Sequence, residues 1–322
     1  MKRTSILLLS LLSLCFFASC RGEEALSPHS VVDEGANVQP ETELTQWIYE
    51  HYTRPYGIAV HYRWNKNTAP QGNYATPPSV EKVKPVLEAI KELFIGLYTD
   101  PEFGGVRFFK GRAPIALYLY GGRSTDPNGV DLMGNSQAPA IELHVYNVDT
   151  FDSTDKDKVY LLLRSVHHQY AKRLMELFPY DRDAFLAISR HRYTYSTKFM
   201  VPLLGGAPAE FYGLNDYANT RGFYSLSAFL SAEDDLAEII SCTLLHTPKD
   251  IREAEERAKT PDYVPDPKMQ EQYNKEAEEA HRELLAKQQF AQQYFEKVVK
   301  LPLRRLQVVS VKKMRNYLAH NS

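Results

Sequence analysis

The chain has 322 residues, and its 38 Lys and Arg against 40 Asp and Glu give a formal net charge of −2. This balance gives no reason to expect nucleic acid as a partner, because nucleic-acid-binding domains gather positive charge. A chain of this length can bury a sizeable hydrophobic core, either as one large domain or as two small ones.

The first 19 residues are predicted to be a lipoprotein signal peptide. Lys2 and Arg3 form a short positive region, and residues 6–17 form an apolar core. This core is too short for a membrane-spanning helix, which needs about 20 residues. The tetrapeptide FASC at 17–20 resembles a lipobox, and the resemblance implies cleavage before Cys20 and acylation of that cysteine. The alternative is an ordinary secretory signal that happens to contain a cysteine.

The mature chain is predicted to be a tethered domain without disulfides. Loss of Lys2 and Arg3 would leave 36 Lys and Arg against 40 Asp and Glu, a net charge of −4. Cys242 would be its sole free thiol, so the core must supply the stability. Residues 20–42 are polar without an apolar period, and we expect a flexible tether leading to a folded domain at 43–320.

The first part of this domain is predicted to be a small mixed sheet with one crossing helix. Apolar residues at 44–52 indicate a short amphipathic helix, and the alternation at 56–64 (YGIAVHYRW) predicts a half-buried strand. Helical spacing predicts a helix over 80–98, in which Pro85 is tolerated only in the first turn. Three more strands are predicted at 106–110, 113–120 and 140–146, with a turn-rich loop at 121–137.

The second part is predicted to be mainly helical, which makes the fold class α+β. Apolar residues recur every three or four positions over 159–177 and define one buried stripe. A second helix is predicted at 232–245, with Ser231 as its N-cap. Residues 249–297 are highly charged and are interrupted by PDYVPDP at 261–267. We expect a long helix with a solvated face after this interruption.

The run from His168 to Lys172 has the spacing of a zinc-hydrolase helix. In the pattern H-E-x-x-H, positions i and i+4 lie on one helical face, so two imidazoles can bind one metal ion. The glutamate takes a proton from the zinc-bound water. Here the run reads His168, Gln169, Tyr170, Ala171, Lys172, so only the first histidine of the pattern is present.

The chain resembles a family of Bacteroidetes lipoproteins described as substrate-import-associated zinc metallohydrolases, which are zincin-like. The resemblance covers roughly residues 43–318. It rests on four features in chain order: PYGIAVHYRW at 55–64, the strand region with a GG loop, the H-H-E-F-A-H-like run at 167–172 and the E-D-F-A-E-like run at 234–238. The closing stretch with Lys287 and LPLRRLQ also looks similar. The resemblance implies an association with TonB-dependent nutrient uptake at the outer membrane.

Carried over residue by residue, the resemblance implies a degenerate zinc site. His168 matches the first ligand, Gln169 the general base and Lys172 the second ligand. Asp234 is the favoured match for the acidic third ligand, and Glu238 is expected to contact the ligands rather than the metal. A glutamine amide cannot accept the proton, so a general-base contribution of about 100- to 10,000-fold should be lost. A protonated lysine has no lone pair and repels Zn²⁺, and three protein ligands are the norm.

We therefore expect no bound cofactor and no competent metallohydrolase. Lys172 is predicted to pair with Asp234 or Glu238, and to hydrogen-bond Gln169, so that the two helices stay docked without zinc. The same residues also have structural interpretations. His168 and Lys172 lie off the predicted stripe and could be surface residues. Asp234 completes an S-x-x-D capping pattern, and Glu238 could be solvated; His167 is predicted to be a core residue.

Three functions remain open on the sequence. The preferred one is a lipid-anchored outer-membrane protein, on the periplasmic or the surface side, that binds a peptide or glycan near a TonB-dependent transporter and its partner lipoprotein. The alternative is an active zinc-dependent peptidase with an atypical ligand set, built from His168, Glu238 and another histidine such as His191 or His246. The third is a purely structural envelope protein.

Overall fold

The computed structural model describes residues 42–63, 76–135, 138–198 and 213–321. The predicted signal peptide, Cys20 and nearly all of the predicted tether lie outside these residues. The chain divides into two units, Met1–Thr45 and Gln46–Ser322, and the description below concerns the second unit apart from the bounds of a helix that begins at Glu43. In the described part of the chain, no helix combines the length and the apolar character needed to cross a bilayer.

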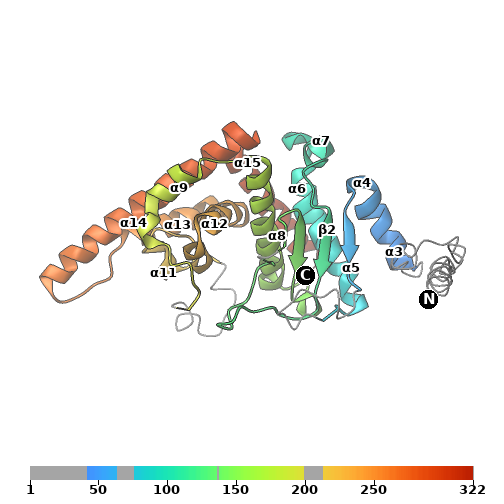
Figure 1. Cartoon of the computed structure of the whole chain (residues 1–322), viewed down its shortest axis with the longest axis horizontal. Helices are drawn as coiled ribbons and strands as arrows, with labels where there is room; N and C mark the ends of the chain where they lie inside the picture. Colours follow the sequence, from blue (N-terminus) through green and yellow to red (C-terminus); the bar gives the residue numbers. More distant parts are fainter. Residues whose placement is uncertain (1–41, 64–75, 136–137, 199–212, 322) are drawn as a thin grey trace, which may run out of the picture. The chain divides into compact units, whose positions relative to one another are not determined.

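The first half of the domain alternates short helical segments with three strands (Figure 1). The elements in order are α3 (Glu43–Ile48), the π-helix η1 (Tyr49–Thr53), α4 (Arg54–Tyr56), β1 (Ala59–His61), α5 (Val80–Ala89), the π-helix η2 (Ile90–Ile95), α6 (Gly96–Tyr98), the 3-10 helix η3 (Pro101–Phe103), α7 (Gly105–Phe109), β2 (Ala116–Leu119), β3 (Glu142–Val145) and the 3-10 helix η4 (Val148–Thr150).

The second half is helical, so the α+β class is confirmed. Its elements in order are α8 (Lys156–Leu177), α9 (Arg182–Ser189), the 3-10 helix η5 (Arg190–Arg192), α11 (Asp216–Asn219), the 3-10 helix η7 (Leu226–Leu230), α12 (Ala232–Leu245), α13 (Pro248–Lys259), α14 (Pro267–Tyr294), the π-helix η8 (Phe295–Val299) and α15 (Leu303–Asn321).

The described sheet is parallel throughout, whereas a mixed sheet was expected. Its strand order is β1-β2-β3, and Ala116 of β2 pairs with Ala59 on one side and Glu142 on the other. Leu117, Leu119 and Leu143 are buried. His61, Tyr118 and His144 stack in a row across the three strands, with ring centroids 4.5 and 4.8 Å apart. Because stacked side chains on neighbouring strands stabilise one alignment of those strands, this row helps to fix the strand register.

Two of the predicted local structures were wrong. Residues 106–109 belong to a short helix, α7, because Gly104 and Gly105 adopt positive φ and turn the chain into it. A run as short as VRFFK fits a strand or a helical turn equally well, and here Phe109 packs in the core. Pro85 was expected in the first turn of its helix but lies in the second turn of α5. Its missing N–H removes the usual helix partner of the Glu81 carbonyl.

The helices around the site begin where their capping residues predict. Ser231 caps α12, and its side chain accepts the Asp234 N–H at 3.0 Å. Asp155 caps α8 in the same way. α8 packs against β3 and η2 on one side and against α12 on the other, and α12 also contacts α14 and α15 (Figure 1).

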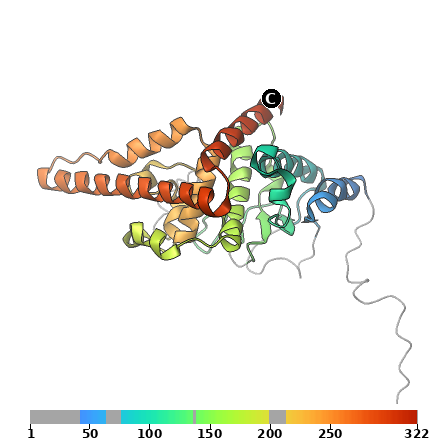
Figure 2. The ribbon, with the colours of Figure 1, turned by 90° about the horizontal axis from the view of Figure 1, so that it is seen from above.

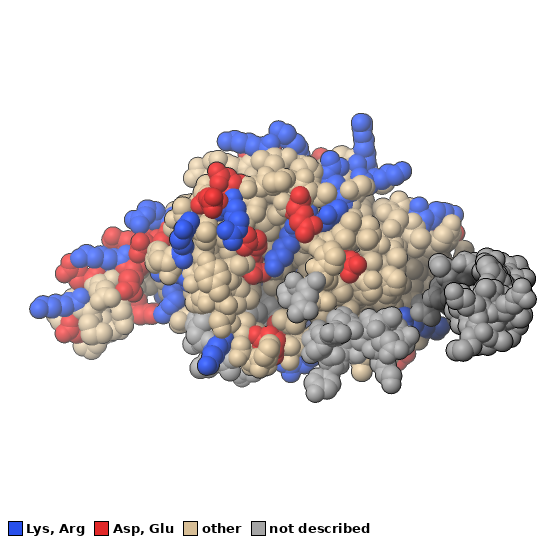
Figure 3. Space-filling view, in the orientation of Figure 1, with Lys and Arg blue, Asp and Glu red and all other residues tan. Residues whose placement is uncertain are grey.

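The charged segment 249–297 forms α13 and α14, which pack along each other (Figure 2). Lys, Arg, Asp and Glu side chains alternate over this part of the molecule (Figure 3). The prediction of a long helix with a solvated face is confirmed.

Candidate zinc-hydrolase-like site

The H-E-x-x-H-like run lies on α8, where a second element covers it. His168 is 6% exposed and Gln169 is 9% exposed, so the interpretation of His168 as a surface residue was wrong. α8 packs against β3 and η2 on one side and against α12 on the other. Apolar spacing alone does not predict that His168 is buried, because polar side chains of α8, Arg164 and His168, contact α12.

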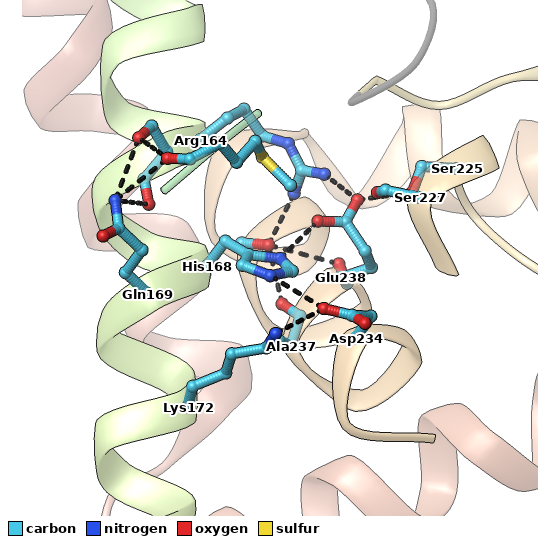
Figure 4. A network of polar contacts seen from close by, with 12 residues as sticks. Arg164, His168, Gln169, Lys172, Ser225, Ser227, Asp234, Ala237 and Glu238 are labelled. Carbon is cyan, nitrogen blue, oxygen red and sulfur yellow. Dashed lines mark hydrogen bonds and ion pairs between the residues drawn. The ribbon is translucent and has the colours of Figure 1, made fainter. Parts of the chain in front are cut away.

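His168 lies between two acidic residues of α12, Asp234 and Glu238 (Figure 4). Its Nδ1 is 2.7 Å from Glu238 Oε1, and its Nε2 is 3.4 Å from Asp234 Oδ1. A carboxylate on one ring nitrogen fixes the orientation of the imidazole and leaves the other nitrogen to a ligand, as around metal-binding histidines. His168 therefore has the arrangement expected of the first histidine ligand in a zinc site.

Lys172 occupies the second ligand position with its ammonium group. Its Nζ lies 2.5 Å from Asp234 Oδ1, so the expected ion pair forms with Asp234. Burial alone would raise the pKa of Asp234. The hydrogen bond from His168 and the charge of Lys172 outweigh burial and hold that pKa well below its ordinary value. Asp234 is thus an ionised carboxylate that already has a cation.

Glu238 is fully buried, so its interpretation as a solvated residue was wrong. It forms an ion pair with the guanidinium of Arg164, itself fully buried, and accepts a hydrogen bond from Ser225. Burial raises the pKa of Glu238. The charge of Arg164 and the hydrogen bond with His168 lower this pKa by more than burial raises it, so the net shift is downward. Arg164 is not among the predicted site residues; its signal in the sequence is an arginine within the apolar stretch of α8.

Gln169 points away from these acidic residues, to the other side of α8 (Figure 4). Its Nε2 donates to the carbonyl oxygens of Met133 and His144, at 3.0 and 2.9 Å, and it also bonds Ser165. Its Oε1 accepts the His144 N–H at 2.9 Å. The hydrogen bond expected with Lys172 is replaced by these contacts. The amide at the general-base position is therefore fully used within the fold.

His167 is a core residue, as predicted. It is 1% exposed among Phe94, Tyr98 and Arg164, and burial together with the charge of Arg164 lowers its pKa to about 3. The His167 ring is therefore neutral at pH 7, and it packs in the core without contacting Asp234 or Glu238 in the described contacts.

The other two histidines considered as ligands have other partners. His246 contacts the Tyr160 hydroxyl and the Cys242 carbonyl. His191 lies with Glu279 and Glu283 in the one group of described residues close enough to hold a metal ion. Arg192 forms ion pairs with both of those carboxylates, which disfavours a second cation there.

A cavity of about 600 Å³ opens beside the site. It is lined by His168, Gln169, Lys172 and Asp234 together with residues of the 126–142 segment and apolar side chains that include Met133, Met175 and Leu230. A volume of this size can hold a small ligand or a few residues of a peptide.

The residues present do not fit a catalytic zinc ion. His168 and Asp234 offer two ligands of acceptable type, but three are the norm. The ammonium of Lys172 lies where the second imidazole would be and already neutralises Asp234. Glu238 is held by Arg164 and is not free for a metal. Gln169 cannot act as a base.

Comparison with known proteins places the chain in the class that the site resembles. A crystal structure titled as a putative zinc-binding metallo-peptidase from Bacteroides caccae ATCC 43185 is similar, with a TM-score of 0.60 and 18% identity, over 86% of this chain and 95% of that chain. At this identity the likeness shows the fold. No curated protein matches the chain. A family model described as "Putative zinc-binding metallo-peptidase" matches residues 37–304, and the chain belongs to this family.

Proposed function

We propose that this member of the zinc-binding metallo-peptidase family is a non-catalytic binding protein. It uses the cavity beside the former metal position to hold a ligand. The observation that carries the proposal is the Lys172–Asp234 ion pair, with 2.5 Å between Nζ and Oδ1. This pair places a positive charge where the family chemistry requires a divalent cation, and it neutralises the acidic ligand.

The charge of the cavity lining favours a ligand with a positive group. Six carboxylates line the cavity: Asp126, Asp131, Glu142, Glu176, Glu233 and Asp234. Lys172 is the lone Lys or Arg among the described lining residues. Within the described part of the chain, Asp126 and Glu142 form no ion pair with Lys or Arg. An amine or guanidinium beside apolar groups would match this lining. Of the two ligand classes expected, this favours a peptide with a basic side chain over a neutral glycan.

The proposed setting is the outer membrane. The predicted lipid on Cys20 would anchor the domain through the polar segment that precedes it, on the periplasmic or the surface side. A TonB-dependent transporter and its partner lipoprotein are the proposed partners. Cross-linking in the native envelope followed by identification of the attached proteins would test this part independently of the ligand.

The metal-free site is tested by elemental analysis of the purified protein. We expect far less than one zinc per chain in the wild type after dialysis against zinc-containing buffer. The variant Lys172→His supplies an imidazole at i+4 from His168 and removes the competing cation, so we expect it to gain zinc. Lys172→Gln is the matched control, because it removes the same charge without adding a ligand. About one zinc per wild-type chain would refute the proposal.

Ligand class is tested by thermal shift with three probes of similar length: a Lys- and Arg-containing pentapeptide, a Glu-containing pentapeptide and a neutral oligosaccharide. A ligand that binds the folded state raises the melting temperature. We expect a shift with the basic peptide, and its loss in a Glu142→Gln variant. A shift with the oligosaccharide and none with the basic peptide would overturn the assignment of the ligand class.

A further inference from the structure

β3 is an edge strand of the described sheet, and no strand of that sheet pairs with the backbone N–H and C=O of His144 on its outer edge. Peptide groups of a strand alternate in direction. The Val145 carbonyl accepts the Tyr120 N–H at 2.8 Å across the β2–β3 ladder. The N–H and C=O of the preceding residue, His144, therefore point away from β2. An edge of this kind is a place where another extended chain can add.

The side chain of Gln169 occupies this edge. Its amide accepts the His144 N–H and donates to the His144 carbonyl, both at 2.9 Å. A neighbouring strand makes the same two contacts with one residue through its backbone. The same Nε2 also reaches the Met133 carbonyl at 3.0 Å, and the Ser165 hydroxyl donates to that carbonyl as well.

Gly134 provides an independent sign that the amide belongs in this position. A Cβ at Gly134 would lie 2.5 Å from Cδ and 2.6 Å from Oε1 of Gln169. The backbone of Gly134 therefore packs directly against the amide group of Gln169. No residue with a side chain fits there while Gln169 is in place.

We propose that Gln169 is a latch that closes the edge of β3 at His144 and fastens the cavity wall around Met133 and Gly134 to α8. While the latch is closed, an extended peptide cannot pair its backbone with His144, so a ligand is recognised through its side chains. Gln169 is thus a specificity-determining residue rather than a remnant of the catalytic base. The latch would act in the same way on any ligand of the cavity.

The latch needs an amide and not a carboxylate. A glutamate could accept the His144 N–H, but it could not donate to the carbonyls of Met133 and His144. Two carbonyl oxygens would then face a negative charge. In a Gln169→Glu variant, the hydrogen bonds that Nε2 donates to the Met133 and His144 carbonyls should therefore be lost.

The test is amide hydrogen exchange of the full mature domain, measured residue by residue by NMR. In Gln169→Leu, the His144 N–H loses its acceptor, and we expect its exchange to rise by about tenfold or more. The Tyr120 and Ile115 N–H groups, which bond to Val145 and Ile141 across the ladder, should keep their wild-type rates. Gln272→Leu is the matched control, because Gln272 bonds only an exposed glutamate in the described structure.

Gly134→Ala tests the same latch without changing its chemistry, since the added Cβ displaces the Gln169 amide. It should also accelerate His144 selectively. Wild-type exchange at His144 in folded Gln169→Leu and Gly134→Ala would overturn the proposal. Equal acceleration of His144, Tyr120 and Ile115 in both variants would overturn it too, because Gln169 would then support the whole sheet and not its edge.

Discussion

Replacing Lys172 with methionine should destabilise the domain through Asp234. Methionine keeps most of the aliphatic stem and removes the ammonium that lies 2.5 Å from Asp234 Oδ1. The carboxylate would keep its contact with His168, 3.4 Å away, and the hydrogen bond that the Ser231 hydroxyl donates to Oδ2 at 2.6 Å. Its desolvation by α8 and α12 would no longer be offset by a full positive charge.

The magnitude follows from the exposure of the two side chains, 33% for Lys172 and 18% for Asp234. Exposed pairs contribute about 0.2–1 kcal/mol, and breaking a buried pair from one side costs about 3–5 kcal/mol. A pair between these limits should cost about 1–2 kcal/mol when Lys172 is truncated. For a domain of this size, that corresponds to a fall in melting temperature of about 2–4 °C.

The loss should depend on pH with a defined sign. Asp234 has a pKa held below its unfolded value of about 3.9, so its contribution to stability is fully present above that pH and is lost as the pH falls toward the folded pKa. Lys172→Met should therefore differ most from the wild type near pH 7. The difference should shrink below about pH 4.

The assay is a double-mutant cycle of Lys172→Met and Asp234→Asn, with urea unfolding followed by circular dichroism at pH 7 and at pH 2.5, below the unfolded pKa of Asp234. We expect a favourable coupling energy of about 1 kcal/mol at pH 7 and a smaller one at pH 2.5. Additive effects of the two substitutions at pH 7 would refute the argument, because the pair would then contribute nothing beyond its separate side chains.

Three further predictions concern the buried polar groups around the site. Arg164→Met should cost about 3–5 kcal/mol in urea unfolding by removing the guanidinium counterion of Glu238 from the core, and adding Glu238→Gln should recover part of that loss. Because the pKa of His167 is lowered to about 3, its contribution is present above about pH 6.5 and falls as the pH drops; His167→Phe should flatten thermal stability between pH 7 and pH 4. Tyr193→Phe removes the hydroxyl that donates to Asp235 at 2.8 Å and should lower the free energy of unfolding by about 1 kcal/mol, with an unchanged urea slope.

The elements that the sequence predicts best are those set by local chemistry. α12 begins after Ser231 and ends at Leu245, as expected, because a serine N-cap and a run of apolar residues act within a few residues of each other. The strand prediction at 106–110 was wrong because five residues carry too little periodicity. The helical turn found there depends on the positive φ of Gly104 and Gly105.

The contacts in the site can be separated in the same way, into those that the sequence pattern predicts and those that it does not. The pairing of Lys172 with an acidic residue follows from the resemblance and the charges alone. The contacts of Arg164 with Glu238 and of Gln169 with His144 join residues 74 and 25 positions apart. Neither a motif nor a period records such pairs. Once α12 and β3 are placed against α8, each of them follows from the need to satisfy a buried polar group.

α12 meets a cation on each side that carries an acidic residue. Asp234 meets Lys172, Glu238 meets Arg164 and Asp235 meets the buried Lys287 of α14, 2.8 Å away. Any rotation of α12 about its axis would leave at least one charge without a counterion inside the protein. The orientation of the helix is thus specified three times over, and two of the three pairs lie outside the cavity. Position 172 can therefore exchange a metal ligand for an ammonium, or for another side chain, while the frame around the cavity stays in register.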